Sequence, residues 1–570
     1  MDDDRLSELP DSLILSILLL LDTREVIRTT LLSKRWKNRW TTIPCLRFRS
    51  RFPFSRDLLV ESSNFISGAL AQWKGAKILE FTIFFSSNDP LTPSCDTDSW
   101  LLFATEKQVE KLTFGFECRP HGAYFVPQCL YSCSSITTLS LYCCSFKIER
   151  NVRWNQLKSL NIRKSEGLSG DAMNQILLGA PRLEKLVLRS FEISENFTIR
   201  STSLMILEII ECNLKAEAEL RIWAPNLLSL EISAYVCGSC LLYVPSLITA
   251  ILSFEIFCGE LDPIDLDDMA PLEMFHQVFR SIRYVQNVSL SDWSIQFLVD
   301  MKENDMLVQF PNAEFLKLDF RLFEMFDVRV VLEMFPKLKR LIVDQGFKND
   351  YMYNSVSSEM ISRSPFLPHL KTVEVIYSSY LAISPLVKFL LENARVLQEM
   401  VLQPNGEEND REAFVSALKE LLGTRRSSPY AKLIINEFMA DYAYAPELIP
   451  LCRCGRGKML VKCAGKEALH AGRFYYKCPA NIKHQGSFLW CDEYHQNEVG
   501  AGQAPRYLSG RMYTPEQEAQ SASLISQVRA AVLGHGDVRP MRLRSDIEII
   551  ITSIFMALAF LFGVVIGKFL

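Results

Sequence analysis

The chain has 570 residues, too many for one compact core, so several domains or a repeat array are expected. Hydrophobic residues make up 48% and charged residues 22%, which excludes a largely disordered chain. The net charge of −4 excludes a chain-wide electrostatic footprint for duplex nucleic acid. The sixteen cysteines follow no disulfide-like spacing and no cleavable signal is visible, which predicts reduced thiols on the cytosolic or nuclear side.

The first predicted elements are short amphipathic helices in residues 5–46, with Trp36 and Trp40 after a Ser-Lys-Arg turn. A few dozen residues cannot bury enough apolar surface to be stable alone. The segment also has more apolar side chains than one helix face of so small a module can bury: Leu9, Leu13, Ile14, Ile17, Leu18 and Leu21. Some of them must therefore meet another protein.

This segment resembles an F-box, the adaptor-binding module of SCF-type ubiquitin ligases. The resemblance rests on Leu9-Pro10-Asp11, on the Leu/Ile run that follows, and on the run from Leu32 to Trp36. It implies an F-box at residues 1–50 that docks a Skp-type adaptor and its cullin complex. The implied adaptor-binding residues are Leu9, Pro10, Ile14, Ile17 and Leu18.

An apolar-x-x-apolar-x-apolar pattern recurs through the middle of the chain. Its copies begin at Ile78, Val109, Ile136, Leu157, Leu183, Leu204, Leu227, Leu247, Val285, Ala313, Leu338, Leu370 and Leu397. From Ile136 to Leu247 the steps are 21, 26, 21, 23 and 20 residues. This range predicts leucine-rich repeats, in which each repeat adds one short strand to a shared elongated core. Short strands in a sandwich are the alternative, and the longer step from Leu247 to Val285 leaves room for an insertion or a broken repeat.

The middle region resembles the leucine-rich repeats that follow F-boxes in plant proteins, and we expect a solenoid over residues 70–410. Its end, about 365–405, resembles the FBD segment of the same family and is interpreted as strand, helix, strand. A cap is needed there because a terminal repeat otherwise exposes its core face. The solenoid offers an extended concave surface for an unknown target protein, on which the sequence nominates no contact residue.

After a linker at 425–450 the composition changes, and residues 451–495 contain a candidate metal site. Zn²⁺ prefers four soft or borderline ligands in a tetrahedron. In a segment with so little core, a bound zinc ion would supply much of the folding energy. The predicted ligands are Cys452, Cys454, Cys478 and His484. Cys463 and Cys491 are further candidates, and reduced cysteines in a metal-free fold are the alternative.

The same segment resembles a GRF-type zinc finger at Cys452–Gly455, at Gly472–Pro479 and at Phe488–Glu493. It lacks the usual last cysteine of that family, for which His484 is the predicted substitute. The resemblance implies binding of single-stranded nucleic acid, which basic groups and stacking rings perform together. The implied contacts are Arg473, Tyr475, Tyr476 and Lys477. The alternative is that the aromatic rings pack in the core of a very small domain. Binding of a protein in place of nucleic acid is a second alternative.

Residues 496–546 are expected to form a linker with a short helix, followed by a transmembrane helix at 547–568. Ile549–Gly567 contains nineteen residues without a charge, which as a helix would span roughly 28 Å, close to a bilayer's hydrocarbon thickness. Arginines precede this run, so the positive-inside tendency predicts a single-pass membrane protein with its N-terminal bulk in the cytosol. A buried helix is the alternative, with a nuclear or cytoplasmic location.

The predicted fold class is multidomain α+β and α/β: a helical F-box, a leucine-rich-repeat solenoid, a zinc-stabilised β-rich finger and a transmembrane helix. The sequence shows no phosphate loop, no nucleophile–base pair and no RING-like run of eight ligands. We therefore predict a non-catalytic receptor subunit of a ubiquitin ligase, which raises the effective concentration of a target lysine. The alternative is a tail-anchored GRF zinc-finger protein that binds nucleic acid or protein. In that case the change of composition near residue 450 would come from two neighbouring genes joined in one predicted transcript.

Overall fold

The structure is a computed structural model that divides into two compact units, residues 1–500 and 501–570. It describes residues 9–49, 56–85, 96–116, 124–165, 167–236, 238–255, 270–320, 326–345, 367–377, 380–404, 424, 426–429, 431–435, 452–454, 459–463, 474–478, 480 and 487–490. Within these ranges no helix combines the length and hydropathy needed to cross a bilayer. The predicted linker 496–546 and the predicted transmembrane helix 547–568 lie outside the described residues.

The N-terminal module is helical. It consists of α1 (Asp11–Leu20), α2 (Thr23–Arg28) and two 3₁₀ helices, Thr29–Leu31 and Arg39–Thr42. Its small core contains the two tryptophans of the sequence motif together with Ile14, Leu18 and Val26. The bulky indole rings supply much of the buried apolar surface of this short segment, and its core is continuous with that of the repeats.

One sheet of sixteen strands follows, and every strand pair in it is parallel. Its strands are β1 (Cys45–Arg49), β2 (Glu80–Phe85), β3 (Lys111–Phe116), β4 (Thr138–Tyr142), β5 (Ser159–Arg163), β6 (Lys185–Arg189), β7 (Glu192–Ile193), β9 (Ile206–Leu214), β11 (Ser229–Val236), β13 (Thr249–Glu255), β14 (Asn287–Ser291), β15 (Phe315–Phe320), β16 (Arg340–Gln345), β17 (Thr372–Tyr377), β18 (Glu399–Pro404) and β19 (Lys432–Ile435). Parallel pairing throughout excludes the sandwich alternative, because sandwiches are built from antiparallel sheets.

All thirteen predicted motifs coincide with strands of this sheet. Each motif begins two residues before its strand, as Leu157 does before β5 and Leu183 before β6. The long step after Leu247 holds an insertion, since β13 and β14 still pair in register. The predicted linker at 425–450 needs a correction, because β19 lies within it and pairs with β18 as the last strand. The apolar run of β19 is too short to predict a strand from the sequence. Its pairing with the edge of β18 is what identifies β19 as a strand.

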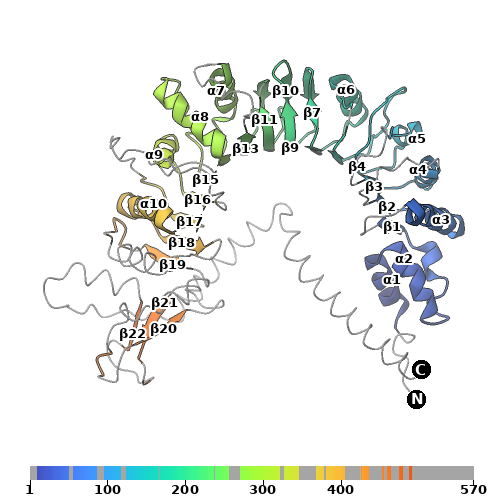
Figure 1. Cartoon of the computed structure of the whole chain (residues 1–570), viewed down its shortest axis with the longest axis horizontal. Coiled ribbons are helices and arrows are strands. Elements are labelled where there is room, and N and C mark those ends of the chain that lie inside the picture. The colour runs from blue at the N-terminus through green and yellow to red at the C-terminus, as the bar shows by residue number, and fades with distance from the viewer. Residues whose placement is uncertain are drawn as a thin grey trace. The chain divides into compact units, whose positions relative to one another are not determined.

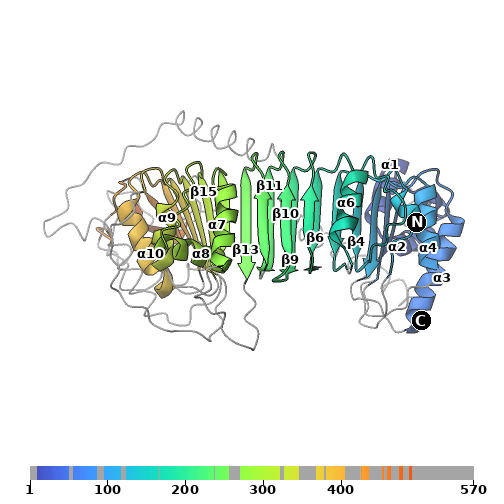
Figure 2. The ribbon, with the colours of Figure 1, turned by 90° about the horizontal axis from the view of Figure 1, so that it is seen from above.

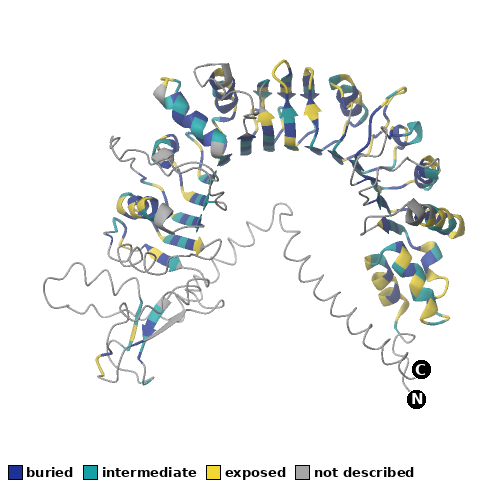
Figure 3. Cartoon of the chain, viewed as in Figure 1, coloured by how far each residue is buried: buried dark blue, intermediate teal, exposed yellow. Residues whose placement is uncertain are grey.

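A layer of helices covers the outer face of the sheet (Figure 1 and Figure 2). The helices are α3 (Arg56–Gln72), α4 (Asp96–Glu106), α5 (Gln128–Tyr131), α6 (Gly170–Gly179), α7 (Ala270–Ile282), α8 (Asp292–Glu303), α9 (Phe326–Glu333) and α10 (Tyr380–Asn393). Between α6 and α7 a second parallel sheet replaces them, made of β8 (Phe197–Arg200), β10 (Glu219–Trp223) and β12 (Ser239–Tyr243). The buried residues lie between the two layers (Figure 3). Alternate residues of each strand, such as Leu160 and Leu186, point into this core.

Successive strands end in the same backbone turn. Cys143, Lys164 and Ser190 follow β4, β5 and β6 with φ of 53°, 52° and 52°, in the left-handed region. The N–H groups of these residues donate to the carbonyls of Arg163, Arg189 and Ile210 in the next strand. This ladder of turns fixes the positions of the last residues on the open face of the sheet.

A third sheet is small and antiparallel. It contains β20 (Leu460–Cys463), β21 (Phe474–Lys477) and β22 (Phe488–Trp490), with β21 in the middle. Met459 and Tyr476 are buried beside it. The predicted β-rich character of this segment is thus present in its described residues.

Candidate functional site

Helix α1 carries apolar side chains on two faces. Ile14 and Leu18, one turn apart, are 1% and 2% exposed and pack into the core of the module. Leu13, Ile17 and Leu20 follow i, i+4, i+7 spacing and are 50%, 37% and 74% exposed. A monomeric soluble protein rarely leaves a row of large apolar side chains in water without a reason. The outward face of α1 is therefore the candidate docking surface of this module.

The predicted adaptor-binding residues divide between the two faces. Ile17 belongs to the outward face and Pro10 is exposed just before α1 begins, whereas Leu9 is partly buried against the core. Ile14 and Leu18 are covered by the chain itself, so they offer a partner almost no surface and support the helix from beneath. The structure adds exposed residues that the prediction did not name as contacts: Leu13, Leu20, Leu15, Leu31 and Leu32. The i, i+4, i+7 spacing was the signal for the first two.

Two ion pairs hold the start of α1 in place. The Asp11 carboxylate accepts hydrogen bonds from Arg35 at 2.6 Å and from Arg39 at 2.7 Å. The hydrogen bond from Arg35, followed by that from Arg39, lowers the pKa of Asp11. Arg35 of the Lys-Arg turn and Arg39 of the following 3₁₀ helix therefore both contact the start of the helix whose outer face is exposed.

The helical module is joined firmly to the first repeat through Arg47 of β1. Its guanidinium donates to both oxygens of the Glu80 carboxylate on β2, at 2.6 and 2.7 Å, and to the carbonyl of Leu19 at the end of α1. The N–H of Arg47 donates to the Thr23 hydroxyl on α2, and the Trp73 indole donates to the Ile43 carbonyl. The edge of the large sheet is thus covered by α1 and α2, which leaves little freedom between the two parts.

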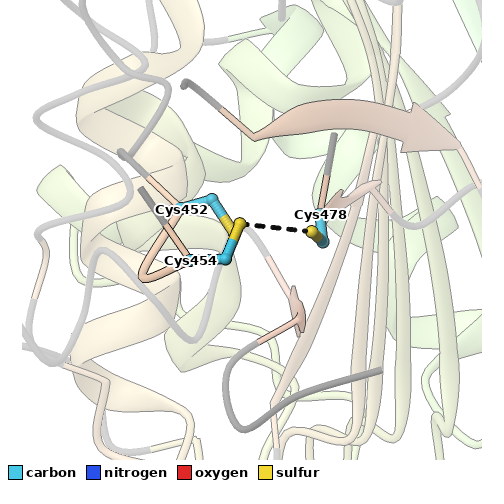
Figure 4. A group of neighbouring side chains, drawn as sticks. All are labelled: Cys452, Cys454 and Cys478. Carbon is cyan, nitrogen blue, oxygen red and sulfur yellow. Dashed lines mark hydrogen bonds between the residues drawn. The ribbon is translucent and has the colours of Figure 1, made fainter. Parts of the chain in front are cut away.

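A second candidate site lies beside the small antiparallel sheet (Figure 4). The sulfur atoms of Cys452, Cys454 and Cys478 all lie within 4.8 Å of one another. The Sγ of Cys454 is 3.3 Å from that of Cys452 and 3.7 Å from that of Cys478. Two thiolates on one tetrahedral zinc ion lie about 3.8 Å apart, so this donor set fits zinc.

Backbone pairing holds Cys478 at this position, because its N–H donates to the Ser487 carbonyl at the start of β22. Cys452 and Cys478 are buried, while Cys454 is more open to solvent. The structure therefore brings three of the four predicted ligands together. The fourth, His484, lies outside the described residues, as does Cys491, and Cys463 ends β20.

Aromatic rings gather on the other face of the small sheet. The Tyr475 ring centroid is 4.7 Å from that of Phe488 and 5.8 Å from that of Trp490, and the last two are 5.0 Å apart. Phe488 is exposed and Trp490 is only partly buried. Tyr476 points the opposite way and is 3% exposed, so it packs in the core and offers no ring face to a ligand. Of the other predicted nucleic-acid contacts, Lys477 is half-buried and Arg473 lies outside the described residues.

Comparison with protein families agrees with the helical module and the repeats. Residues 6–48 match the F-box domain. Residues 97–240 match the family described as "FBD-associated F-box protein At5g56370, LRR repeats". The helical module with its exposed helix face and the parallel sheet behind it are therefore similar to the F-box domain and to the leucine-rich repeats of that family.

Similar proteins occur in Arabidopsis thaliana. The chain is 25% identical over 452 residues to FBD-associated F-box protein At5g22730, covering 76% of this chain and 94% of that protein. F-box/FBD/LRR-repeat protein At1g13570 is 25% identical over 452 residues, covering 76% and 98%. Putative F-box protein At1g49610 is 32% identical over 211 residues, covering 36% and 50%. The chain is therefore similar to plant F-box/FBD/LRR proteins over about three quarters of its length.

Proposed function

We propose that this protein is the substrate-recognition subunit of an SCF-type ubiquitin ligase. The F-box would dock a Skp-type adaptor with its cullin complex, and the repeats would bind the target protein. The observation that carries the proposal is the outward apolar row of α1, formed by Leu13, Ile17 and Leu20. Burying one such side chain contributes about 1.5–3 kcal/mol, so a partner that covers the row gains much of its affinity there.

Such a receptor acts by proximity and needs no catalytic group of its own. It raises the effective concentration of a target lysine near the charged conjugating enzyme. The junction at Arg47 supports this role, because the same guanidinium contacts α1 through Leu19 and the first repeat through Glu80. A target held on the repeats would therefore keep a defined position relative to the adaptor.

Co-purification with a Skp-type adaptor tests the proposal. The double change Ile17→Asp and Leu20→Asp puts two charges on the docking row, and we expect it to reduce bound adaptor more than about tenfold. Leu178→Asp is the matched control, since Leu178 lies on α6 of the repeat layer and is 83% exposed. Circular dichroism should show both variants folded. Equal amounts of adaptor on the double variant and on the parent protein would overturn the proposal.

We also propose that Cys452, Cys454 and Cys478 bind a structural zinc ion, with His484 as the fourth ligand. The support is the distance between the three sulfurs, which suits a tetrahedral ion. Zinc would supply folding energy to a sheet in which few of the described side chains are buried. The full-length protein should contain about one zinc per chain by mass spectrometry, and chelation should expose residues 452–490 to proteolysis. Unchanged protease resistance after complete metal removal would refute the site.

The rings of Tyr475, Phe488 and Trp490 favour one alternative, that of a tail-anchored zinc-finger protein whose main contact is single-stranded nucleic acid. Exposed rings beside basic groups stack bases with little sequence preference. A fluorescent oligothymidylate should then bind the full chain, and Tyr475→Ala with Trp490→Ala should weaken binding by roughly tenfold or more. If the parent protein leaves the oligonucleotide unbound at low salt, this alternative is removed.

The membrane anchor remains a proposal that rests on sequence alone, in the uncharged run of residues 549–567. If it is right, the full-length protein stays with membranes after a carbonate wash, and deletion of residues 547–570 releases it. Release of the full-length protein by carbonate would contradict the anchor. The receptor proposal does not depend on this result, because the F-box and the repeats lie in the other compact unit.

A further inference from the structure

Two arginines stand side by side on the open face of the large sheet. Arg163 ends β5 and Arg189 ends β6, and the two residues are direct partners in the parallel register. Neighbouring strands lie about 4.8 Å apart, so the two guanidinium groups start from adjacent points of one row. Both residues are half-buried, and their carbonyls accept hydrogen bonds from the N–H groups of Cys143 and Lys164 in the turns after β4 and β5. The backbone beneath the pair is therefore fixed.

Among the described residues, the pair differs from several other cations of this face, which form ion pairs with carboxylates. Lys185 contacts Glu208 at 2.6 Å, and Lys317 contacts Asp344 at 3.3 Å. In the part of the chain that the structure describes, neither Arg163 nor Arg189 forms an ion pair with a carboxylate. The Nε of Arg163 is buried there without a hydrogen-bond acceptor. Like charges directly opposite on neighbouring strands are destabilising, so this arrangement is best satisfied by an anion from outside.

The two sides of the pair differ in character. On one side lie aromatic rings, because Tyr142 is the register partner of Arg163 and its ring meets Phe84 edge-on at 5.4 Å. Gly115 lies between these two rings with φ of +153°, and a Cβ there would come within 2.2 Å of the Tyr142 carbonyl oxygen. The glycine therefore allows the rings to meet over its strand. This side offers an apolar surface next to two positive charges.

Carboxylates lie on the other side of the pair. Glu208 and Glu231 are register partners on β9 and β11, the next strands after β6. Burial raises the pKa of Glu231, and the nearby Glu208 carboxylate raises it further, while Arg189 and Lys185 act against this rise. A polyanion long enough to extend along the sheet would be repelled by these carboxylates. The positive region is therefore suited to a compact anion.

We propose that Arg163 and Arg189 bind a phosphorylated side chain of the target protein, with the segment beside it lying over Tyr142 and Phe84. A phosphate monoester carries about −1.5 to −2 charges at neutral pH, which matches two guanidinium groups, whereas a carboxylate carries one. Its three oxygens can accept charge-assisted hydrogen bonds from both arginines. This inference rests on the proposed function, because it names the chemistry that the receptor would recognise. Binding of the target would then depend on a kinase.

The test uses fluorescent degenerate peptide pools with one fixed central residue. One set carries phosphoserine, phosphothreonine or phosphotyrosine, and matched sets carry serine or aspartate. In fluorescence anisotropy the full-length protein should bind at least one phosphorylated pool about tenfold or more tighter than the matched pools. Phenyl phosphate should compete, whereas oligothymidylate, whose phosphodiesters carry one charge each, should compete poorly.

Charge-matched variants locate the site. Arg163→Gln with Arg189→Gln should reduce phosphopeptide binding by about tenfold or more. The control is Arg182→Gln with Arg221→Gln, which removes the same charge from an exposed position before β6 and from the outer sheet strand β10. It should stay within about twofold of the parent protein. Thermal melting should show both variants folded.

Several outcomes would overturn the inference. These are equal binding of the aspartate and phosphorylated pools, loss of binding in both double variants, full competition by oligothymidylate, or absence of binding to any pool. Adaptor co-purification, measured on the same samples, separates this inference from the proposed function. A parent protein that binds phosphopeptide but no adaptor would sink the receptor proposal and leave the phosphate site intact.

Discussion

The repeat array and the small sheet of β20–β22 are stabilised in different ways. In the array, every strand buries alternate apolar residues against neighbours on both sides, as Leu160 and Leu186 do. In the small sheet the buried side chains among the described residues are Met459, Tyr476 and two cysteines. Stability is therefore spread over nearest-neighbour contacts in the array and concentrated at one sulfur cluster in the sheet.

Removing one sulfur of the cluster should have the largest effect. We expect Cys478→Ser to unfold residues 452–490, because the apparent binding free energy of structural zinc is about 10–16 kcal/mol in small fingers. Hydrogen exchange by mass spectrometry on the full chain should show loss of protection there and unchanged protection in β4–β6. Cys240→Ser, at a buried cysteine of the outer layer, is the control and should leave the zinc content unchanged. Retained protection in β21 of Cys478→Ser would show that the sheet is stable without its cluster.

A cavity in the array should have a smaller and local effect. Leu186→Ala removes a fully buried side chain of β6 and should cost about 2–5 kcal/mol of unfolding free energy. Hydrogen exchange should rise in β5, β6 and β9 and stay unchanged in β16–β18, because each repeat contacts only its neighbours. Leu178→Ala on the exposed face of α6 should change stability by less than about 0.5 kcal/mol. Uniform destabilisation of all strands would show that the array unfolds as one cooperative unit.

Breaking the contact between Arg47 and Glu80 should reduce the free energy of unfolding by an intermediate amount that depends on pH. Arg47→Met removes the pair of bonds to Glu80 and should lower stability by about 2 kcal/mol at pH 7. The hydrogen bonds from Arg47 lower the pKa of Glu80, so this stability is present above the usual carboxyl range and is lost as the pH falls through the lowered value. Denaturant unfolding at several pH values should show the difference from the parent shrinking below about pH 4.

Glu80→Gln separates the charge from the packing at this junction. It keeps a hydrogen-bond acceptor for Arg47 and removes the titrating group. The difference between the parent protein and this variant should therefore also shrink at low pH, whereas the difference between Glu80→Gln and Arg47→Met should not change with pH. A constant difference between the parent protein and both variants would show that Glu80 does not carry the pH dependence.

The smallest expected effect concerns the start of α6. The Ser169 hydroxyl accepts a hydrogen bond from the Ala172 N–H at 3.2 Å, as an N-cap residue does. Ser169→Ala should cost about 1 kcal/mol, measured by denaturant unfolding, and Ser169→Asp should restore most of the loss. If both variants match the parent protein, the cap makes no contribution and the contacts of α6 with β8 hold the helix.

Much of the fold could be predicted because its signal repeats. Each motif begins with an apolar residue two positions before a strand, and this holds at thirteen strands. The alignment of the repeats can therefore be read from the sequence. The outer layer could not be predicted in the same way. Strands β8, β10 and β12 replace helices between α6 and α7, and the alternating burial along β8 and β10 is a pattern that the thirteen repeat motifs do not include. The last strand, β19, was mistaken for linker because it consists of four residues.

The candidate sites show the same division. Three cysteines were predicted as ligands from their spacing and chemistry, and their sulfurs lie together. Of the three exposed residues in the row on α1, Ile17 is named as an adaptor contact from the sequence, whereas Leu13 and Leu20 are not named as contacts. Tyr476 was named as a nucleic-acid contact although alternation along β21 sends it to the buried face. A residue list without a register cannot distinguish the two faces of a strand.

Residue types and their local spacing are sufficient to predict the F-box motif, the period of the repeats and the clustering of cysteines. Packing between elements, which local spacing does not reveal, leaves one apolar face of α1 open and covers the other with the chain's own core. The fold shows which face is which. It also placed Arg163 next to Arg189 and Arg47 between two elements, since register between strands brings together residues from different repeats. Local spacing sets the elements, and packing between them sets the surfaces that a partner can reach.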